Sequence, residues 1–409
     1  MLGHLPMRVL ALNQYYAPDA SATAQLLTDL CEDLVKAGDE VRVVASRVQG
    51  DRRLPAHECI DGVEVVRPWS TGYGKSRLTY RFLDDLSFVA AAASRACVVA
   101  RPDVILALSA PPMVATAAAL AARGRELPLV HWVHDVYPDI ALATGVLPRR
   151  SALGSTLQIL SRMTHRHAAM SIAVSSKMAE ILKAHGQSAD RVRVQENWAD
   201  GTAIQPRPAA ATSFRARHGL KGRFVVMYSG NLGLVHDIAT PIRAAHELSS
   251  SCPDVVFVFV GAGARLAEAR ALAGEAANIR FLPAQPRGEL SDSLAAANLH
   301  LVSLAEGMEG LVVPSKLYGV MAAGRPVVYI GPALSEVAHV VRRHELGWRV
   351  DPGDAVGLAA IVADATRRGD DLAACGERAR RRFVERHERA VATTALRGLL
   401  LEAANLRVQ

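Results

Sequence analysis

A lysine stands at the first turn of a predicted helix, in the segment VPSKLY (residues 313–318). Ser315 is a favourable residue just before a helix, and Gly324 with Pro326 close behind predicts where the helix stops. The amino end of a helix already carries positive potential, so acidic side chains are favoured there and a lysine is not. We therefore expect an anion, most simply a diphosphate, to lie against Ser315 and to be paired by Lys316. The alternative is a capped surface helix whose lysine points into water.

Two other turns have the small residues that a phosphate site needs. One has the sequence SGNLG after a predicted strand, and the other is the VGAG turn after the next strand. Small side chains allow backbone N–H groups to approach an oxyanion, and the helix that follows adds positive potential. Neither turn is a complete G-x-G-x-x-G motif, so each taken alone is equally well explained as a tight turn. The residues concerned are Ser229, Gly230, Asn231, Gly233 and Gly261.

A third strand end, Leu282-Pro283 in the segment 281–290, is a candidate for reading a nucleotide base. Backbone atoms at such an edge can hydrogen-bond to the Watson–Crick face of a base. An ordinary proline-containing loop is the alternative.

In the first half of the chain, the segment HWVHDVYPD (residues 131–139) places His134 and Asp135 at the end of a predicted strand. A histidine there can donate a hydrogen bond to a ligand hydroxyl or phosphate, and we expect it to be readily charged. The alternative is that His131 or His134 is a core histidine with its hydrogen bonds satisfied. The loop 14–23 follows the first strand and is equally well explained as a surface loop that caps a helix.

Strand-like apolar runs alternate with amphipathic helical runs along the whole chain, which predicts parallel sheets with crossover helices. In the first half, strands are predicted at 8–14, 40–46, 103–109, 128–135 and 171–175, with a helix at 20–38. In the second half, strands are predicted at 223–230, 255–263, 279–284, 299–304 and 326–331, with helices at 237–250, 264–275, 286–296 and 315–323. Residues 199–214 lose this periodicity and are predicted to link two domains. A cleft between the domains, at the carboxyl ends of the strands, is where ligands are expected.

The bulk composition limits the function classes. The 409 residues suit two domains, and the formal charge of +7 fits anionic ligands, an anionic membrane face or a plain solvated surface. The chain lacks both a long Lys/Arg block and an aromatic platform, so nucleic-acid binding is not expected. Five cysteines without a C-x-x-C spacing indicate reduced thiols in a cytosolic protein rather than disulfides or a zinc site. No D-x-D pair of carboxylates occurs, so we expect no metal to hold a diphosphate.

Contact with a membrane is an open possibility in the sequence. Residues 73–81 (YGKSRLTYR) are basic and aromatic and could lie on an anionic membrane surface, although their mixed charges favour a solvated helix end. Residues 104–122 are uncharged, but Pro111-Pro112 divides them into a predicted strand and helix instead of a membrane span. Residues 1–7 are too short and too polar for a signal peptide. We expect a cytoplasmic location, with the inner face of the cell membrane as an option.

Taken together, these segments resemble the retaining glycosyltransferases of family 4, more closely the branch that includes colanic-acid and O-antigen sugar transferases. That family has the GT-B architecture, an α/β fold with two Rossmann-like doubly wound domains facing a central cleft. The segments that carry the resemblance are NQYYAPD (13–19), SAPPMVA (109–115), HDVYPDIALATGVL (134–147), VQENWAD (194–200) and VPSKLYGVMAAGRPVV (313–328).

The resemblance implies transfer of a sugar from a nucleotide diphosphate donor with retained anomeric configuration, without a metal or a separate cofactor. Residues 1–200 would bind the acceptor, residues 201–385 the donor, and residues 386–409 would form a helix that packs back on the first domain. The implied donor site contains Ser229, Gly230, Asn231, Gly233, Gly261, Leu282, Pro283, Glu306, Gly310, Leu311, Pro314, Ser315 and Lys316. The implied catalytic residues are His134, Asp135, Lys316 and Glu309, with His134 near the reacting carbon of the donor sugar.

Two departures from the family pattern stand out. Family members commonly have an arginine in the SGN turn and a lysine shortly after it, where this chain has Asn231 and then His236 or Asp237. Lys316 is therefore the expected substitute for this basic pair. The glutamate that often binds the ribose is replaced by Gly319, so Glu306 or Glu309 would serve the sugar hydroxyls instead.

The sequence therefore predicts a glycosyltransferase that uses a UDP-sugar, such as a UDP-N-acetylhexosamine, and a glycan, polyprenyl-linked or small-molecule acceptor. Two alternatives stay open at this point. One is a non-hydrolysing nucleotide-sugar epimerase of similar architecture, and the other is a nucleotide-sugar-binding subunit that has lost activity.

Overall fold

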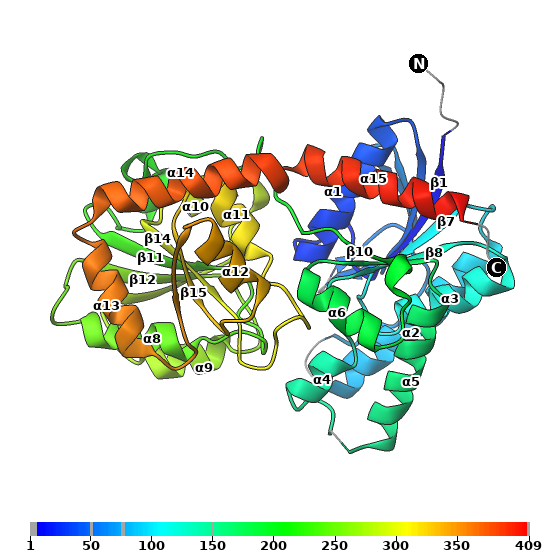
Figure 1. Cartoon of the computed structure of the whole chain (residues 1–409), viewed down its shortest axis with the longest axis horizontal. Coiled ribbons are helices and arrows are strands. Elements are labelled where there is room, and N and C mark those ends of the chain that lie inside the picture. The colour runs from blue at the N-terminus through cyan, green and yellow to red at the C-terminus, as the bar shows by residue number, and fades with distance from the viewer. Residues whose placement is uncertain (1–5, 50–51, 75–77, 149, 407–409) are drawn as a thin grey trace. The chain divides into compact units, whose positions relative to one another are not determined.

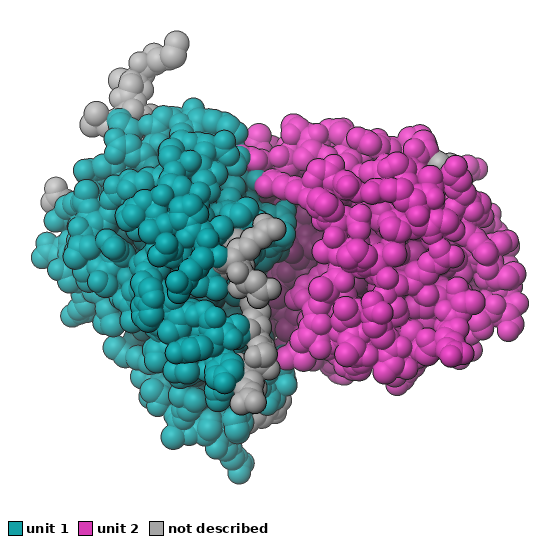
Figure 2. Space-filling model, turned by 180° about the vertical axis from the view of Figure 1, so that it is seen from behind, with its two compact units in different colours: residues 1–196, 392–409 teal, residues 197–391 magenta. Residues whose placement is uncertain are grey.

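The computed structural model describes residues 6–49, 52–74, 78–148 and 150–406. It divides into two compact units, unit 1 with residues 1–196 and 392–409 and unit 2 with residues 197–391 (Figure 2). Each unit has its own mainly parallel sheet covered by helices (Figure 1), which confirms the predicted α/β class with two doubly wound domains. Residues 1–5 and 75–77, parts of two segments discussed above, lie outside the described residues.

In unit 1 the described strands form an eight-stranded sheet in the order β10-β9-β8-β7-β1-β2-β6-β5, plus the short pair β3 (Val48–Gln49) and β4 (Arg52–Arg53). The sheet strands are β1 (Arg8–Leu12), β2 (Glu40–Val44), β5 (His57–Ile60), β6 (Val63–Val66), β7 (Val104–Ala107), β8 (Leu129–Val133), β9 (Met170–Ala173) and β10 (Val192–Val194). All neighbours run parallel except β5 and β6. The strand order reverses between β1 and β7, and such a switch point is where ligands bind in open α/β sheets.

The helices of unit 1 are α1 (Ala22–Lys36), α2 (Leu78–Val98), α3 (Val114–Gly124), α4 (Asp139–Ala143), α5 (Ala152–His167), α6 (Ser176–Ala184) and α15 (Arg389–Asn405). Helices α2, α3 and α5 lie on one side of the sheet (Figure 1). The buried alanines of α3, such as Ala118 and Ala122, let this helix approach Leu10 and Ile105 of the sheet closely, while Phe88 of α2 packs on the same cluster. Residues 104–122 thus form the predicted strand and helix.

Helix α15 closes unit 1 from the far end of the chain. The Arg397 guanidinium donates to both carboxylate oxygens of the fully buried Asp39 at 2.6 and 3.0 Å, and Asp39 Oδ1 also accepts from the Met7 N–H at 3.1 Å. The Thr393 hydroxyl donates to Asp33 on α1 at 3.0 Å. This helix is therefore fixed to unit 1 by paired, partly buried charges.

In unit 2 the described strands form one parallel sheet in the order β13-β12-β11-β14-β15-β16. They are β11 (Phe224–Ser229), β12 (Val255–Val260), β13 (Ile279–Leu282), β14 (Leu299–Ser303), β15 (Val327–Ile330) and β16 (Gly347–Val350). The helices are α7 (Ser213–Arg217), α8 (Ala239–Leu248), α9 (Leu266–Ala273), α10 (Leu290–Ala295), α11 (Lys316–Ala322), α12 (Glu336–Arg343), α13 (Ala355–Ala365) and α14 (Gly369–Arg386). Here the strand order reverses between β11 and β14, which puts the loops after these two strands at the switch point.

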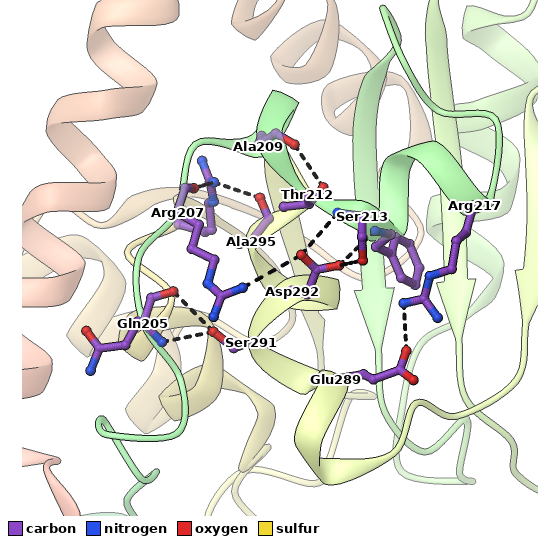
Figure 3. Close-up of polar contacts among 12 residues, drawn as sticks. Gln205, Arg207, Ala209, Thr212, Ser213, Arg217, Glu289, Ser291, Asp292 and Ala295 are labelled. Atoms are coloured by element: carbon purple, nitrogen blue, oxygen red, sulfur yellow. Dashed lines mark hydrogen bonds and ion pairs between the residues drawn. The ribbon is translucent and has the colours of Figure 1, made fainter.

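The segment predicted as an interdomain link, residues 199–214, lies largely on unit 2, and the units divide between residues 196 and 197. Figure 3 shows why this segment is held there. The Gln205 N–H donates to the Ser291 hydroxyl at 3.0 Å, and Asp292 of α10 accepts from the Phe214 N–H at 2.7 Å and from the Ser213 hydroxyl at 2.8 Å. Asp292 thereby caps the start of α7, a contact between residues 78 positions apart that local periodicity does not indicate.

Candidate functional site

The switch point of unit 2 brings Lys316 against the SGN turn. Lys316 begins α11, and its neighbour Ser315 makes no capping hydrogen bond with its side chain. The Lys316 Nζ lies 2.7 Å from the Tyr228 hydroxyl, 3.2 Å from His236 Nε2 and 4.3 Å from the centre of the Tyr228 ring. The lysine is therefore directed back toward the ends of β11 and β14 instead of into water.

The hydrogen-bond roles at this lysine follow from its neighbours. His236 Nδ1 is 2.7 Å from the Ser303 carbonyl, which can only accept, so Nδ1 carries the proton and Nε2 accepts from Lys316. The Tyr228 hydroxyl donates to the Asn231 carbonyl at 2.9 Å and therefore also accepts from Lys316. Two protons of the Lys316 amine are used in this way.

Burial decides the charges of this group. Desolvation lowers the pKa of Lys316 to about 7, and burial together with the nearby Lys316 lowers the pKa of His236 to about 3. Without a ligand, the Lys316 amine therefore loses its proton near pH 7, far below the pH at which an exposed lysine does so. A third proton on Nζ would need a new acceptor, and an anion supplies one.

Close backbone contacts explain the glycines of the two turns. Gly230 has φ +138°, and a Cβ there would lie 3.1 Å from Lys316 Cε. Gly261 has φ +139°, and a Cβ there would lie 2.1 Å from the Gly230 carbonyl oxygen. Ser229 ends β11, Asn231 is exposed, and Gly233 follows in the same turn. The absence of side chains at Gly230 and Gly261 is therefore what allows the turns and the lysine to meet.

The loop from Leu304 to Ser315 follows β14 and carries the other predicted donor residues of this region. Glu306 is exposed, Glu309 and Ser315 are half-buried, and Gly310 and Pro314 are buried. The Leu311 N–H, predicted to face phosphate or sugar, donates to the Met308 carbonyl at 3.1 Å. By contrast, the N–H groups of Ser315 and Lys316 have no hydrogen-bond partner among the described residues.

At the strand end that was predicted to bind the nucleotide base, the carbonyl groups of Leu282 and Pro283 already accept hydrogen bonds. The Leu282 carbonyl accepts from the Gly261 N–H at 3.0 Å, and the Pro283 carbonyl accepts from Gln285 Nε2 at 2.9 Å. Each carbonyl oxygen retains a second lone pair for a ligand. Gly319 contributes no side chain, and a Cβ there would lie 3.4 Å from Leu294 Cδ1, so its position adjoins apolar packing.

In unit 1, His134 and Asp135 follow β8 at the carboxyl edge of the sheet. One hydroxyl, Ser109 Oγ after β7, accepts from the backbone N–H groups of His134 at 3.1 Å and Asp135 at 3.2 Å. The His134 ring packs 4.5 Å from the Trp132 ring, and its Nε2 is buried without a hydrogen-bond partner in the described part of the chain. Ser109 thus fixes the backbone of both predicted residues.

The expected ready charging of His134 is not what the structure indicates. Burial lowers the pKa of His134 to about 3, so its imidazole is neutral, and burial raises the pKa of Asp135 to about 6. The alternative of a core histidine with satisfied hydrogen bonds does not fit His134 either, because no described residue forms a hydrogen bond with Nε2. A neutral imidazole with a free ring nitrogen can serve as a hydrogen-bond partner for a sugar hydroxyl.

Sequence reasoning missed several residues that build these sites. Tyr228 and His236 hold Lys316, and Arg265 donates to the His236 carbonyl at 2.7 Å. In unit 1, Asp85 of α2 accepts from Gln14 Nε2 at 3.0 Å. The one available signal was that His236 stands where the family pattern places a basic residue. The other contacts join residues far apart in the chain.

The described residues contain no group of three or more His, Cys, Asp or Glu side chains that could hold a metal ion. None of the helices within the described ranges has the length and apolar character that crossing a bilayer requires.

Two family models match most of the chain. Residues 23–201 match the model described as Glycosyltransferase Family 4, and residues 211–382 match the model described as Glycosyl transferases group 1. Each match falls almost entirely within one of the two structural units.

Two curated proteins and one solved structure illustrate the similarity. The probable glycosyltransferase WbjE of Pseudomonas aeruginosa is 28% identical over 264 residues, which cover 64% of this chain and 66% of that protein. The putative colanic acid biosynthesis glycosyl transferase WcaI of Escherichia coli is 23% identical over 378 residues, 88% of this chain and 92% of that protein. Anabaena Alr3699/HepE in complex with UDP-glucose has a TM-score of 0.72 at 19% identity, covering 97% of this chain and 100% of that one. The fold is thus the GT-B arrangement of two Rossmann-like domains.

Proposed function

The chain belongs to the glycosyltransferases of family 4, and we propose that it transfers a sugar from a UDP-sugar to an acceptor hydroxyl with retention of the anomeric configuration. The acceptor is a glycan, a lipid-linked glycan or a small molecule. Similarity to a protein whose structure was solved with UDP-glucose supports a UDP-linked donor. An N-acetylhexosamine is our candidate for the sugar.

The observation that carries this proposal is the position of Lys316. Its Nζ is held by Tyr228 and His236 beside the glycine turn, at the switch point of the sheet that the proposal assigns to the donor. Departure of the leaving group builds negative charge on the diphosphate. A charged Lys316 would stabilise that charge, together with the N–H groups of Ser315 and Lys316, which have no partner within the described ranges. One well-placed donor contributes about 3 kcal/mol.

We propose that Lys316 performs this role without a divalent metal ion. The sequence has no D-x-D motif of the kind that often holds one, and a protonated Lys316 supplies a positive charge at the same place. In unit 1, the neutral His134 would contact the donor sugar near the reacting carbon, and Asp135 would lie beside the acceptor hydroxyl. Glu306 or Glu309 would bind sugar hydroxyls in place of a carboxylate at Gly319.

Calorimetric titration with UDP, GDP and ADP in the presence of EDTA tests the donor site. We expect the wild type to bind UDP, and Lys316→Ala to bind it at least about tenfold more weakly, or ~1.4 kcal/mol. Lys221→Ala, which removes an exposed lysine from the same unit, is the matched control and should bind UDP like the wild type. Binding that requires Mg²⁺, or equal affinity of Lys316→Ala and the wild type, would contradict the proposal.

A further inference from the structure

Unit 1 has a pocket beside Asp135, here called the α3–α5 pocket. It lies between the carboxyl ends of β7 and β8 and helices α3 and α5, which pack against each other on one face of the sheet (Figure 1). The centre of a water-sized group can occupy about 30 Å³ of this pocket, which is room for about two such groups. Much of the wall is polar. The polar side chains that line it include Ser109, Thr116, His131, Asp135, Ser161 and His165.

The hydroxyl protons on the helical side of the wall are used within the protein. Thr164 Oγ1 donates to the Leu160 carbonyl at 3.0 Å, so Thr116 Oγ1, which is 2.7 Å from Thr164 Oγ1, donates to Thr164. The Ser161 hydroxyl donates to the Tyr137 carbonyl at 2.9 Å. These groups hold the wall together and can only accept a further hydrogen bond from a ligand.

Ser109 and Asp135 leave one donor and one acceptor unused. Ser109 Oγ accepts from the N–H groups of His134 and Asp135, and its own proton has no acceptor among the described residues. The Asp135 carboxylate forms no hydrogen bond or ion pair within the described ranges. A ligand hydroxyl can satisfy both groups, since it accepts one hydrogen bond and donates another.

The two histidines of the wall are neutral. Burial, and after it the neighbouring His165, lowers the pKa of His131 well below its usual range, and burial followed by His185 lowers the pKa of His165 to about 4. The His131 and His165 rings stack with their centres 5.1 Å apart, and Nδ1 of each is buried without a hydrogen-bond partner in the part of the chain that is described. The rings therefore add hydrogen-bonding capacity beside the pocket but no positive charge.

Asp135 is the one ionised side chain among the described residues that line the pocket, and no lysine or arginine accompanies it there. Outside the wall, Asp85 and Arg81 both affect the pKa of Tyr137, which also lines the pocket, and their opposite charges offset each other. A carboxylate or phosphate group in the pocket would therefore meet Asp135 without a cation to balance it, and such contacts between like charges are strongly unfavourable.

We propose that the α3–α5 pocket is a subsite for the acceptor and takes an uncharged hydroxyl-bearing substituent of a sugar, most simply the hydroxymethyl group of a hexose. One carbon and one oxygen match the available room. The hydroxyl accepts from Ser109 and donates to one oxygen of Asp135, which leaves the second oxygen of Asp135 for the reacting hydroxyl.

This inference rests on the proposed function, because it assumes that unit 1 binds the acceptor. It adds the class of acceptor. The sugar that receives the transferred residue is a neutral hexose, whether free or at the end of a glycan, and not a uronic acid or a sugar phosphate.

Saturation-transfer NMR with methyl glycosides tests the subsite without a donor and without turnover. The full-length protein is titrated at about pH 8, where Asp135 is ionised, because its pKa is about 6. The ligands are the methyl glycosides of glucose, galactose and mannose and those of the matching uronic acids, in which a carboxylate replaces the hydroxymethyl group. We expect at least one hexoside to bind with the largest saturation on its C6 protons, and its uronic acid to bind at least about tenfold more weakly.

Substitutions at the two unused groups sharpen this test. Asp135→Asn keeps the shape of the side chain and removes its charge, so the difference between hexoside and uronic acid should fall below about threefold. Ser109→Ala should weaken hexoside binding about fivefold, and Ser109→Thr should restore it. Asp190→Asn is the matched control, because it makes the same change at an exposed aspartate of unit 1, and it should discriminate like the wild type.

Several results would overturn the inference. They are no saturation of any hexoside, saturation centred away from C6, equal binding of hexoside and uronic acid, and unchanged discrimination in Asp135→Asn. Titration of the same proteins with UDP separates this inference from the proposed function. If UDP binds and one of these results is obtained, only the acceptor class is wrong, whereas failure to bind UDP contradicts the proposed function whatever the glycosides show.

Discussion

Both units place their candidate residues at the carboxyl edge of a mainly parallel sheet, but the hydrogen bonding of these residues differs between the units. In unit 2 the amine of Lys316 has two hydrogen-bond partners, Tyr228 and His236. In unit 1 the backbone of His134 and Asp135 is fixed by Ser109, while His134 Nε2 is buried and has no hydrogen-bond partner among the residues that the structure describes.

This difference suggests how the work of the two units is divided. An amine that is already oriented needs only to carry its proton to bind a diphosphate with little rearrangement, which favours affinity in the ground state. An unpartnered ring nitrogen has no favourable contact until a substrate group reaches it, which favours interactions made during the reaction. Variants of unit 2 should therefore change mainly nucleotide affinity, and variants of unit 1 mainly turnover.

The largest expected effect is that of His134→Ala. We expect the turnover number, followed as UDP release from the UDP-sugar with acceptor present, to fall about a hundredfold because a contact to the reacting sugar is lost. The dissociation constant for UDP should change less than about threefold, since His134 is not a diphosphate ligand. Lys316→Ala is the reciprocal comparison and should raise that dissociation constant.

If His134→Ala lost as much UDP affinity as Lys316→Ala, the proposed division of roles between the two units would be wrong. Conversion of the UDP-sugar to an isomer without any acceptor would point to the epimerase alternative. A wild type that binds UDP but shows no turnover with any acceptor tested would favour the inactive subunit.

The pH dependence of UDP binding tests whether Lys316 takes up a proton when the nucleotide binds. Its pKa is about 7 in the free protein, and a bound diphosphate favours the charged amine and so raises that pKa. Above pH 7 each binding event must therefore take up a proton, and the dissociation constant should rise by up to about tenfold per pH unit. The phosphate group of UDP, with a second pKa of about 6, keeps a constant charge in this range.

Calorimetry between pH 7 and 9 in buffers of different ionisation enthalpy measures both the affinity and the proton uptake. Lys316→Ala should show neither the slope nor the uptake. A flat profile in the wild type would mean that Lys316 stays charged in the free protein.

The Ser109→Ala substitution should have a smaller effect on turnover. It leaves the N–H groups of His134 and Asp135 without their common acceptor and loosens the turn after β8. We expect turnover to fall about tenfold while UDP affinity is retained, with Ser109→Thr, which keeps the hydroxyl, close to the wild type. Steady-state kinetics alongside UDP titration checks this expectation, and a loss confined to UDP affinity would contradict it.

The smallest effect is expected for Tyr228→Phe. This change removes one acceptor of the Lys316 amine and the hydrogen bond to the Asn231 carbonyl, but the aromatic ring beside Nζ remains. UDP affinity should fall about threefold to fivefold, corresponding to one neutral hydrogen bond of about 1 kcal/mol. Turnover at saturating donor should be nearly unchanged, and a large fall in turnover alone would place Tyr228 with the catalytic group.

The fold was largely predictable because period-two and helical patterns are local. The strands that the sequence did not predict are the short pair β3 and β4, strands β5, β6 and β10 of unit 1, and β16 of unit 2. In β16, the four residues Gly347–Val350 are mostly half-buried at the sheet edge and leave a weak apolar signal. Lys316 could be nominated from its conflict with the helix dipole, but its partners could not. Tyr228 and His236 lie 88 and 80 residues away in sequence, and only packing of β11 against β14 brings them together. The neutral state of His134 likewise depends on burial between segments.

The pairing of Arg397 with Asp39 has a consequence for biosynthesis. The two residues are 358 positions apart. During synthesis, Asp39 therefore cannot form its ion pair with Arg397 until almost the whole chain has left the ribosome. Unit 2 is one continuous stretch, residues 197–391, and can complete its folding first. Nascent unit 1 therefore emerges first but is finished last, which makes it the half most in need of chaperone protection.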